Sequence, residues 1–356
     1  MLDRAKIVDE QFIERVQRKD FPPARSDTTP LMAGLNKQTA LSLFDSQIKS
    51  RLLDIIAREL KEQNLSFYTI GSSGHEGNAA IAEVFRPQDM AFLHYRSGAF
   101  YLQRAKQVAE GDGINDILLS LVTAAADPCS GGRHKVFGSV PLFIPPQTST
   151  IASHLPKALG AALSIARAHT LHHQGTLAQD AVILCSFGDA SVNHASAQTT
   201  FNSGAWLASQ NYPLPIVFIC EDNGIGISVP TPKHWIKNGI ACRPHLHYLT
   251  CDGLNIADVF LNAQKAQYLA RIKKQPVFLH MNCVRLLGHA GSDIQSQYLS
   301  QQQIEAMEAS DPLLHTARLM VQENWLSLEE IVALYRNTRA LIESQVQNVL
   351  TLPKLS

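Results

Sequence analysis

The sequence lacks the features that mark several broad classes of protein. None of its six cysteines forms a Cys-x-x-Cys pair and several lie in apolar runs, which favours reduced core thiols of a cytoplasmic protein over a zinc or disulfide framework. No apolar run is long enough to cross a membrane, and the first residues lack a secretory signal core. Thirty-one basic residues balance thirty-one acidic ones, so nothing points to nucleic acid or an anionic membrane.

What the sequence does contain is an ordinary globular balance in a long chain. Its 356 residues are 45% hydrophobic and 17% charged, which is enough to bury a large core. We expect three parts: an N-terminal extension over residues 1–36, an α/β domain over residues 37–300 and a helical segment over residues 301–356.

The centre of the chain carries two apolar runs that each end in a polar turn. Residues 181–187 (AVILCSF) precede Gly188 and Asp189, and residues 215–220 (PIVFIC) precede a turn that contains Asn223. Unbroken apolar runs are typical of parallel strands buried on both faces. The sequence therefore predicts an α/β fold, with a doubly wound and mostly parallel sheet flanked by helices.

The two polar turns predict a ligand site, because open α/β sheets bind ligands at the carboxyl ends of their strands. Asp189 offers a carboxylate oxygen and Asn223 an amide oxygen. Such hard oxygens suit Mg²⁺, which keeps coordination positions open for water and phosphate. The alternative is that Asp189 only caps the following helix. The second turn, at a compatible distance, favours a metal-bridged diphosphate.

An earlier stretch supplies candidate diphosphate ligands. A glycine-rich loop over residues 71–77 precedes an expected helix, and the short apolar run over residues 90–94 ends at Tyr95 and Arg96. The planar guanidinium of Arg can give a phosphate two charge-assisted hydrogen bonds, and the Tyr hydroxyl adds one more donor. Taken alone, Arg96 in a surface ion pair is the simpler interpretation.

Taken in order, these motifs resemble the alpha subunit of the thiamine-diphosphate-dependent decarboxylating component of 2-oxo acid dehydrogenase complexes, of branched-chain or pyruvate type. The family motif opens with Gly-Asp-Gly and closes on Asn, as residues 188–190 and Asn223 nearly do. The resemblance implies the diphosphate-binding module of the thiamine-diphosphate fold, with Mg²⁺. By it, Asp189, Asn223 and the backbone carbonyl of Ile225 hold the metal, beside the cofactor-binding residues Gly188, Ala190 and Ser191.

The same resemblance assigns the other site residues. Tyr95, Arg96 and Ser149 match positions at the diphosphate, and Ile151 matches the aliphatic residue that holds the cofactor bent, although a core role is its ordinary alternative. His289 lies in a loop, VRLLGHAGSDI, at another expected strand end. A histidine suits proton delivery. By the resemblance His289 contacts the cofactor and is catalytic.

The implied activity is oxidative decarboxylation of a 2-oxo acid, branched-chain by preference, with acyl transfer to the lipoyl group of an acyltransferase component. The family completes its site with a beta subunit, so we expect an α₂β₂-like assembly or a fused beta domain. Pyruvate and acetoin systems remain alternatives. So does a non-catalytic scaffold or regulatory relative.

Three departures from the family motif motivate that last alternative. Ala190 stands where the motif has Gly, and Asn223 follows Asp189 by 34 residues, which is longer than usual. Glu221 occupies a position that is cationic or neutral in many relatives, and a carboxylate beside a diphosphate is repelled unless it is screened. Either Glu221 points away from the phosphate or the phosphate pocket differs.

Overall fold

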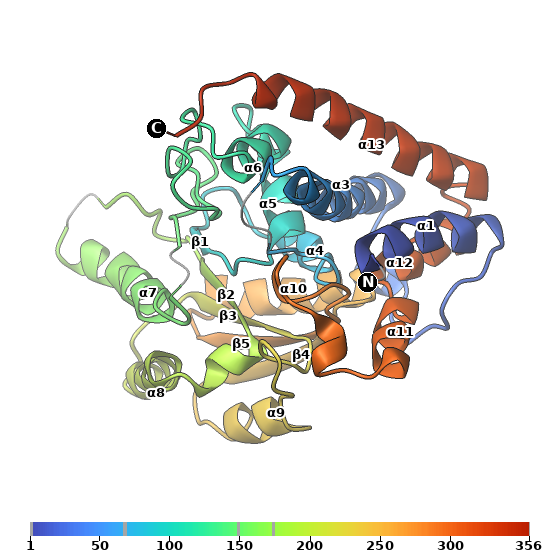
Figure 1. Cartoon of the computed structure of the whole chain (residues 1–356). Coiled ribbons are helices and arrows are strands. Elements are labelled where there is room, and N and C mark those ends of the chain that lie inside the picture. Colours follow the sequence, from blue (N-terminus) through green and yellow to red (C-terminus); the bar gives the residue numbers. More distant parts are fainter. Residues whose placement is uncertain (1–2, 67–69, 148–149, 173–174, 356) are drawn as a thin grey trace.

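One parallel sheet organises the chain in the computed structural model, which describes residues 3–66, 70–147, 150–172 and 175–355. Its five strands follow the order β1-β2-β3-β5-β4, and every pair of neighbours is parallel (Figure 1). The strands are β1 (Ala91–Phe92), β2 (Ile183–Gly188), β3 (Ile216–Asp222), β4 (His247–Asp252) and β5 (Val277–Asn282). The predicted α/β class is confirmed.

Helices connect and cover the strands. The α-helices are α1 (Arg4–Gln17), α2 (Pro30–Ala33), α3 (Lys37–Glu62), α4 (Asn78–Val84), α5 (Gly98–Ala105), α6 (Gly113–Leu121), α7 (Leu155–Thr170), α8 (Ala195–Ser209), α9 (Trp235–Ile240), α10 (Ile256–Arg271), α11 (Gln301–Ala309), α12 (Pro312–Gln322) and α13 (Leu328–Leu350). Two 3-10 turns are η1 (Asp189–Asn193) and η2 (Gln295–Gln297). No described helix is both long and apolar enough to span a bilayer.

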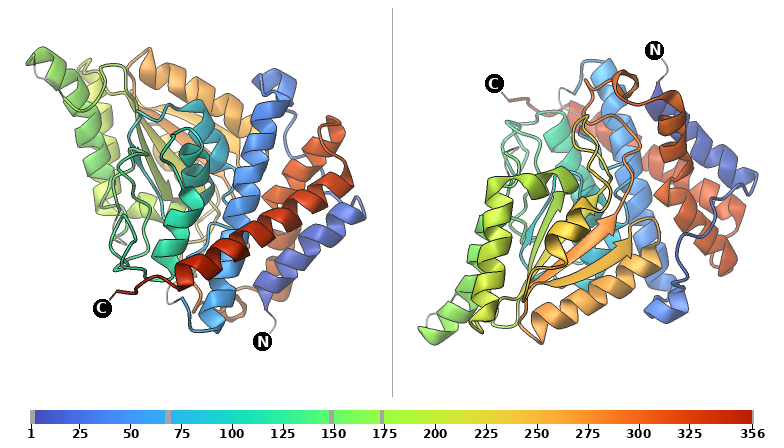
Figure 2. Two further views of the ribbon diagram at one scale, coloured as in Figure 1. Left: turned by 90° about the horizontal axis from the view of Figure 1, so that it is seen from above. Right: turned by 90° about the horizontal axis from the view of Figure 1, so that it is seen from below.

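The sheet is buried on both faces because side chains of a strand alternate between its two sides. Val217 and Ile219 of β3 join a core with α3, α4 and α10, whereas Ile216 and Phe218 join a second core with α7 and α8. Figures 1 and 2 show the two sets of helices on opposite sides of the strands. The doubly wound arrangement is therefore confirmed.

The two ends of the chain pack on the same side of the molecule. Helix α1 contacts α12 and α13, and both of these contact α3. The Phe12 and Tyr335 rings lie 4.6 Å apart between α1 and α13. Both terminal regions thus share the larger core with the sheet. The division at residues 36 and 300 remains a prediction.

One expected element boundary needs correction. Glu221 and Asp222, which the sequence assigned to a turn, belong to β3, because pairing with Met281 and Asn282 of β5 continues through them. Strand pairing sets this limit, and it is not visible in an apolar run.

Candidate active site

The two polar turns predicted at the ends of β2 and β3 lie in contact. Gly188 pairs with Glu221 at the end of the β2-β3 ladder. A Cβ built on Gly226 would lie 3.2 Å from that of Ala190, so the two turns touch there. Thr231, in the loop after β3, donates a hydrogen bond to the Asp189 carboxylate. Sequence reasoning missed Thr231, since it lies in a loop without any periodic pattern.

Asp189 is a buried carboxylate with no cationic side chain nearby. It is 2% exposed, and burial raises its pKa. Within the described part of the chain, no Lys, Arg or His nitrogen lies within ion-pair distance of it. A buried carboxylate without a compensating positive charge reduces the free energy of unfolding. A divalent cation bound at this position would supply the missing charge.

Asn223 is held at both ends of its side-chain amide. Its Nδ2 lies 3.0 Å from Nε2 of His75, and its Oδ1 accepts a hydrogen bond from the Ile225 amide at 3.2 Å. Ile225 itself forms an isolated antiparallel bridge with Pro230, which closes the turn that carries both residues. The two predicted metal-binding turns are therefore backbone-constrained, and their oxygens lie at the carboxyl edge of the sheet.

Arg96 supplies the positive charge that the sequence predicted. It is 3% exposed, and its guanidinium donates to the Gly71 carbonyl at 2.7 Å and approaches Nδ1 of His289 at 3.0 Å. It also lies 5.0 Å from the centre of the Tyr95 ring. No carboxylate pairs with Arg96 among the residues described, so the surface-pair interpretation is wrong. Its location suits an anionic ligand.

A second arginine, which sequence reasoning missed, lies close by. Arg285 is 2% exposed and donates to the carbonyls of Gly226 and Ile227, and to the Tyr298 hydroxyl. It thus ties the loop after β5 to the loop after β3. Arg285 belongs to the same VRLLGH segment as His289. This closeness in sequence was the signal that could have marked Arg285 as a site residue.

His289 is kept neutral by its surroundings. Burial lowers its pKa to about 4, and the charges of Arg96 and Arg285 add to the effect. Arg96 can only donate, so Nδ1 of His289 accepts and the ring proton is on Nε2. Its backbone amide donates to Asp293, which fixes the loop. A neutral, anchored imidazole of this kind can donate through Nε2 or take up a proton.

A cavity of about 220 Å³ opens beside these groups. Tyr95, Ser191 and His289 line it together with Ile151, which is 43% exposed. Ile151 is therefore a cavity residue and not a core residue. Much of the remaining lining is apolar and comes from Leu93, Ile117, Val136 and Phe137. Ser149, the other predicted diphosphate residue, lies outside the described residues.

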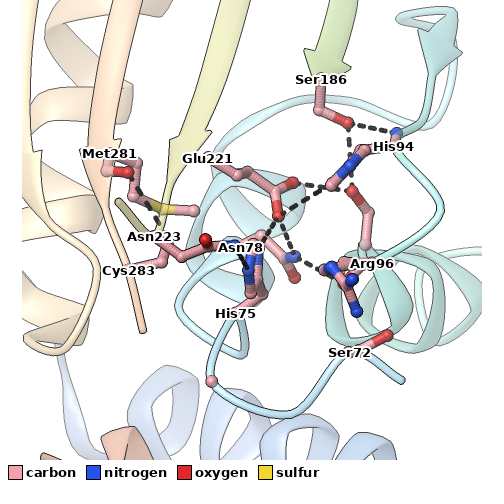
Figure 3. Close-up of polar contacts among 12 residues, drawn as sticks. Ser72, His75, Asn78, His94, Arg96, Ser186, Glu221, Asn223, Met281 and Cys283 are labelled. Atoms are coloured by element: carbon pink, nitrogen blue, oxygen red, sulfur yellow. Dashed lines mark hydrogen bonds and ion pairs between the residues drawn. The ribbon is translucent and has the colours of Figure 1, made fainter. Parts of the chain in front are cut away.

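Glu221 does not line the cavity, and its carboxylate lies in a buried polar cluster (Figure 3). Its carboxylate accepts from Ser97 at 2.8 Å, and its Oε2 lies 2.6 Å from Nδ1 of His75. Although burial acts to raise the pKa of Glu221, the partnership with His75 and His94 lowers it. This arrangement supports the first of the two possibilities that the sequence left open for Glu221, that it points away from a bound phosphate.

Among the described members of this cluster, the His94 side chain has the fewest hydrogen bonds. It is 4% exposed, and neither ring nitrogen has a hydrogen-bond partner in the part of the chain that the structure describes, although Nδ1 lies 3.8 Å from Glu221. His75, His94 and Glu221 have the residue types of a metal site. The 2.6 Å contact between His75 and Glu221 is, however, the length of a hydrogen bond, so a proton lies between them.

Both histidines stood in segments that the sequence had singled out. His75 lies in the 71–77 loop, and His94 directly precedes Tyr95. The available signal was the acid at position 221, because a carboxylate at the end of a buried strand requires donors nearby. Which residues would supply them depends on how the loop folds back over β3.

Comparison with known proteins agrees with this geometry. A sequence model of the family described as "Dehydrogenase E1 component" matches residues 45–356. The chain is 28% identical to the 2-oxoisovalerate dehydrogenase subunit alpha of Bacillus subtilis, over 84% of this chain and 86% of that one. It is 25% identical to the mitochondrial subunit of Caenorhabditis elegans (83% and 65%) and 24% identical to that of Homo sapiens (90% and 69%). The chain therefore belongs to the dehydrogenase E1 component family, as a chain of the alpha type.

Proposed function

We propose that this chain is the alpha subunit of a 2-oxo acid dehydrogenase that uses thiamine diphosphate and Mg²⁺. The observation that carries the proposal is a pair of complementary, uncompensated charges at one edge of the sheet. Among the described residues, no cationic side chain pairs with the buried Asp189 carboxylate, and no carboxylate pairs with the buried Arg96 or Arg285. A metal-bound diphosphate satisfies both sets at once.

Each residue then has a definite task. Asp189, Asn223 and the Ile225 carbonyl would hold the metal, and Tyr95 and Arg96 the diphosphate, with Gly188, Ala190 and Ser191 forming the turn beside them. Thiamine diphosphate, when bound, supplies the electron sink for decarboxylation. Ile151 would support the cofactor from the cavity wall. His289, which burial and the neighbouring charges of Arg96 and Arg285 keep neutral, would orient the substrate and transfer a proton at Nε2.

We propose a branched-chain 2-oxo acid as the substrate. The support is the apolar lining of the cavity beside His289 and the relatives named 2-oxoisovalerate dehydrogenase. An aliphatic side chain gains free energy when such walls remove it from water. The acyl group would pass to a lipoyl-bearing acyltransferase component. A panel of 2-oxo acids offered to the assembled enzyme tests this choice.

A beta subunit, or a fused beta domain, would complete the site in an α₂β₂-like assembly. Exposed apolar side chains beside the cavity support this part of the proposal, namely Ile151, Ile227 and Val229. We place the assembly in the cytoplasm, which agrees with six cysteines that are all free.

The test is calorimetric titration of thiamine diphosphate with Mg²⁺ into the chain, alone and with a candidate beta subunit. We expect binding that requires Mg²⁺ and tightens with the partner. Asp189→Ala should weaken it at least tenfold, because it removes a metal ligand. Asp180→Ala is the matched control, since Asp180 is exposed and pairs with Arg86 away from the site. Equal binding by the wild type and Asp189→Ala contradicts the metal assignment.

A further inference from the structure

Glu221, His75 and Asn223 form a continuous chain of hydrogen bonds that ends at a proposed metal ligand. Nδ1 of His75 lies 2.6 Å from the Glu221 carboxylate, and Nε2 of the same ring lies 3.0 Å from Nδ2 of Asn223. His75 and Glu221 are fully buried, so solvent does not compete for these contacts. Figure 3 shows the ring placed between the carboxylate and the amide.

The direction of each hydrogen bond in this chain follows from the groups at its two ends. The Glu221 carboxylate already accepts from the Ser97 hydroxyl and can only accept from His75 as well, so Nδ1 carries a ring proton. At the other end the Ile225 amide can only donate, so it contacts the Asn223 oxygen and leaves the Asn223 NH₂ group facing Nε2 of His75, which accepts. The amide oxygen of Asn223 therefore points away from His75, and among the described residues it meets only the Ile225 amide.

We propose that Glu221 and His75 are positioning residues that hold the Asn223 oxygen toward the metal. The inference rests on the proposed function, because it concerns a ligand of the Mg²⁺ assigned there. In this proposal the carboxylate at position 221 has a role, which is to orient the His75 ring. An amide that is free to rotate presents either NH₂ or C=O, and only the oxygen ligates a hard cation.

The loop that carries His75 is rigid enough for this task. The His75 amide donates to the Ser72 carbonyl at 2.9 Å. Gly74 has a φ of +101°, and a Cβ there would lie 2.1 Å from the Val284 carbonyl, so the loop is pressed against the chain after β5. Its amide donates to Glu76, whose other oxygen accepts from the buried Arg51. The ring is thus held from both sides.

The first test needs neither cofactor nor partner. ¹⁵N NMR of the full chain labelled at histidine distinguishes the two neutral tautomers, and His75→Gln assigns the signal. We expect His75 to be protonated on Nδ1 and unprotonated on Nε2, which is the less common form. A ring protonated on Nε2 overturns the inference and leaves the proposed function untouched.

The second test compares two substitutions at one position. In His75→Asn the new amide reaches Glu221 but not Asn223, whereas in His75→Gln it reaches Asn223. We expect His75→Asn to weaken Mn²⁺ binding in the presence of thiamine diphosphate by about 10–100-fold, as loss of a ligand-orienting group does. His75→Gln should retain more of the affinity. Mn²⁺ electron paramagnetic resonance measures it.

A purely structural role for His75 as the partner of Glu221 predicts the opposite order. His245→Asn is the control, because His245 is exposed and precedes β4 at the other end of the sheet. Equal affinity in the wild type and His75→Asn overturns the inference alone. Absence of any metal-dependent binding in the wild type, with or without the partner, overturns the proposed function and the inference with it.

Discussion

The protonation of His94 links the active-site cluster to the stability of the protein. The ring is 4% exposed, and burial lowers its pKa to about 4 although Glu221 acts in the opposite direction. In the unfolded chain the same group has its ordinary pKa near 6.5. Between pH 6.5 and pH 4 the unfolded state therefore binds a proton that the folded state does not bind.

Acidification through that window should consequently destabilise the wild type. The pKa difference corresponds to a loss of about 3 kcal/mol in the free energy of unfolding between pH 6.5 and pH 4. His94→Gln removes the titrating group, so its stability should fall less over the same range. Urea denaturation at pH 7, 6 and 5 measures this, with the exposed His245→Gln as control. Parallel pH dependence in the wild type and His94→Gln would show that His94 is not responsible.

Between elements, another close approach near the site is made by two glycines. Gly77, at the start of α4, lies against the carbonyl of Gly253 in the turn between β4 and α10, and a Cβ on Gly77 would lie 2.2 Å from that oxygen. The neighbouring atom is backbone, so the two elements must separate to admit a methyl group. This contact helps to place the 71–77 loop, and with it His75.

We expect Gly77→Ala to destabilise the fold by about 1–3 kcal/mol, the usual effect of forcing extra volume into a packed region. Gly239→Ala in α9 is a matched control, because nothing lies within 4 Å of its Cβ position. There the substitution should be neutral or stabilise by up to about 1 kcal/mol, as Ala favours a helix over Gly. Chemical denaturation compares the two. Similar losses in both variants would contradict the packing argument.

Sequence patterns predicted the strands in which almost every residue is buried and apolar. The apolar runs of β2 and β3 located those strands, and the shared carboxyl edge brought Asp189 and Asn223 into neighbouring turns. The resemblance assigned Arg96 and His289 to the same site without pairing them, and the two side chains lie 3.0 Å apart. These successes rest on regular geometry, since parallel strands end together.

Contacts made by loops were not predictable in the same way. Thr231 reaches Asp189, and Arg285 reaches Gly226, across segments with no period of two or 3.6 residues. Glu221 was assigned to a turn because it is charged. Its neighbour Cys220 faces the core on the α7 and α8 side, so alternation along β3 sends Glu221 to the opposite side, toward His75. That step requires knowing that β3 extends this far.

At the scale of the whole molecule, an apolar rim, formed by Ile227, Val229 and Trp235, lies on the segment that follows β3 beside the site. The turn closed by Ile225 and Pro230 carries Ile227, which is 57% exposed and lines the cavity, and Val229, which is 73% exposed. Trp235, at the start of α9, is 53% exposed in the segment that follows. Exposed apolar side chains gathered beside a functional cavity are typical of an interface.

The beta subunit of the proposed assembly should cover this rim. Val229→Asp places a charge on it without touching the core, so we expect an unchanged melting temperature but at least tenfold weaker association, equivalent to about 1.4 kcal/mol. Leu171→Asp is the control, because Leu171 is also well exposed, at 64%, but follows α7 at the opposite end of the strands. Size-exclusion chromatography with light scattering, on the chain mixed with its candidate partner, measures the complex. If Val229→Asp assembles as tightly as the wild type, the partner does not bind over this turn and the site must be completed from another side.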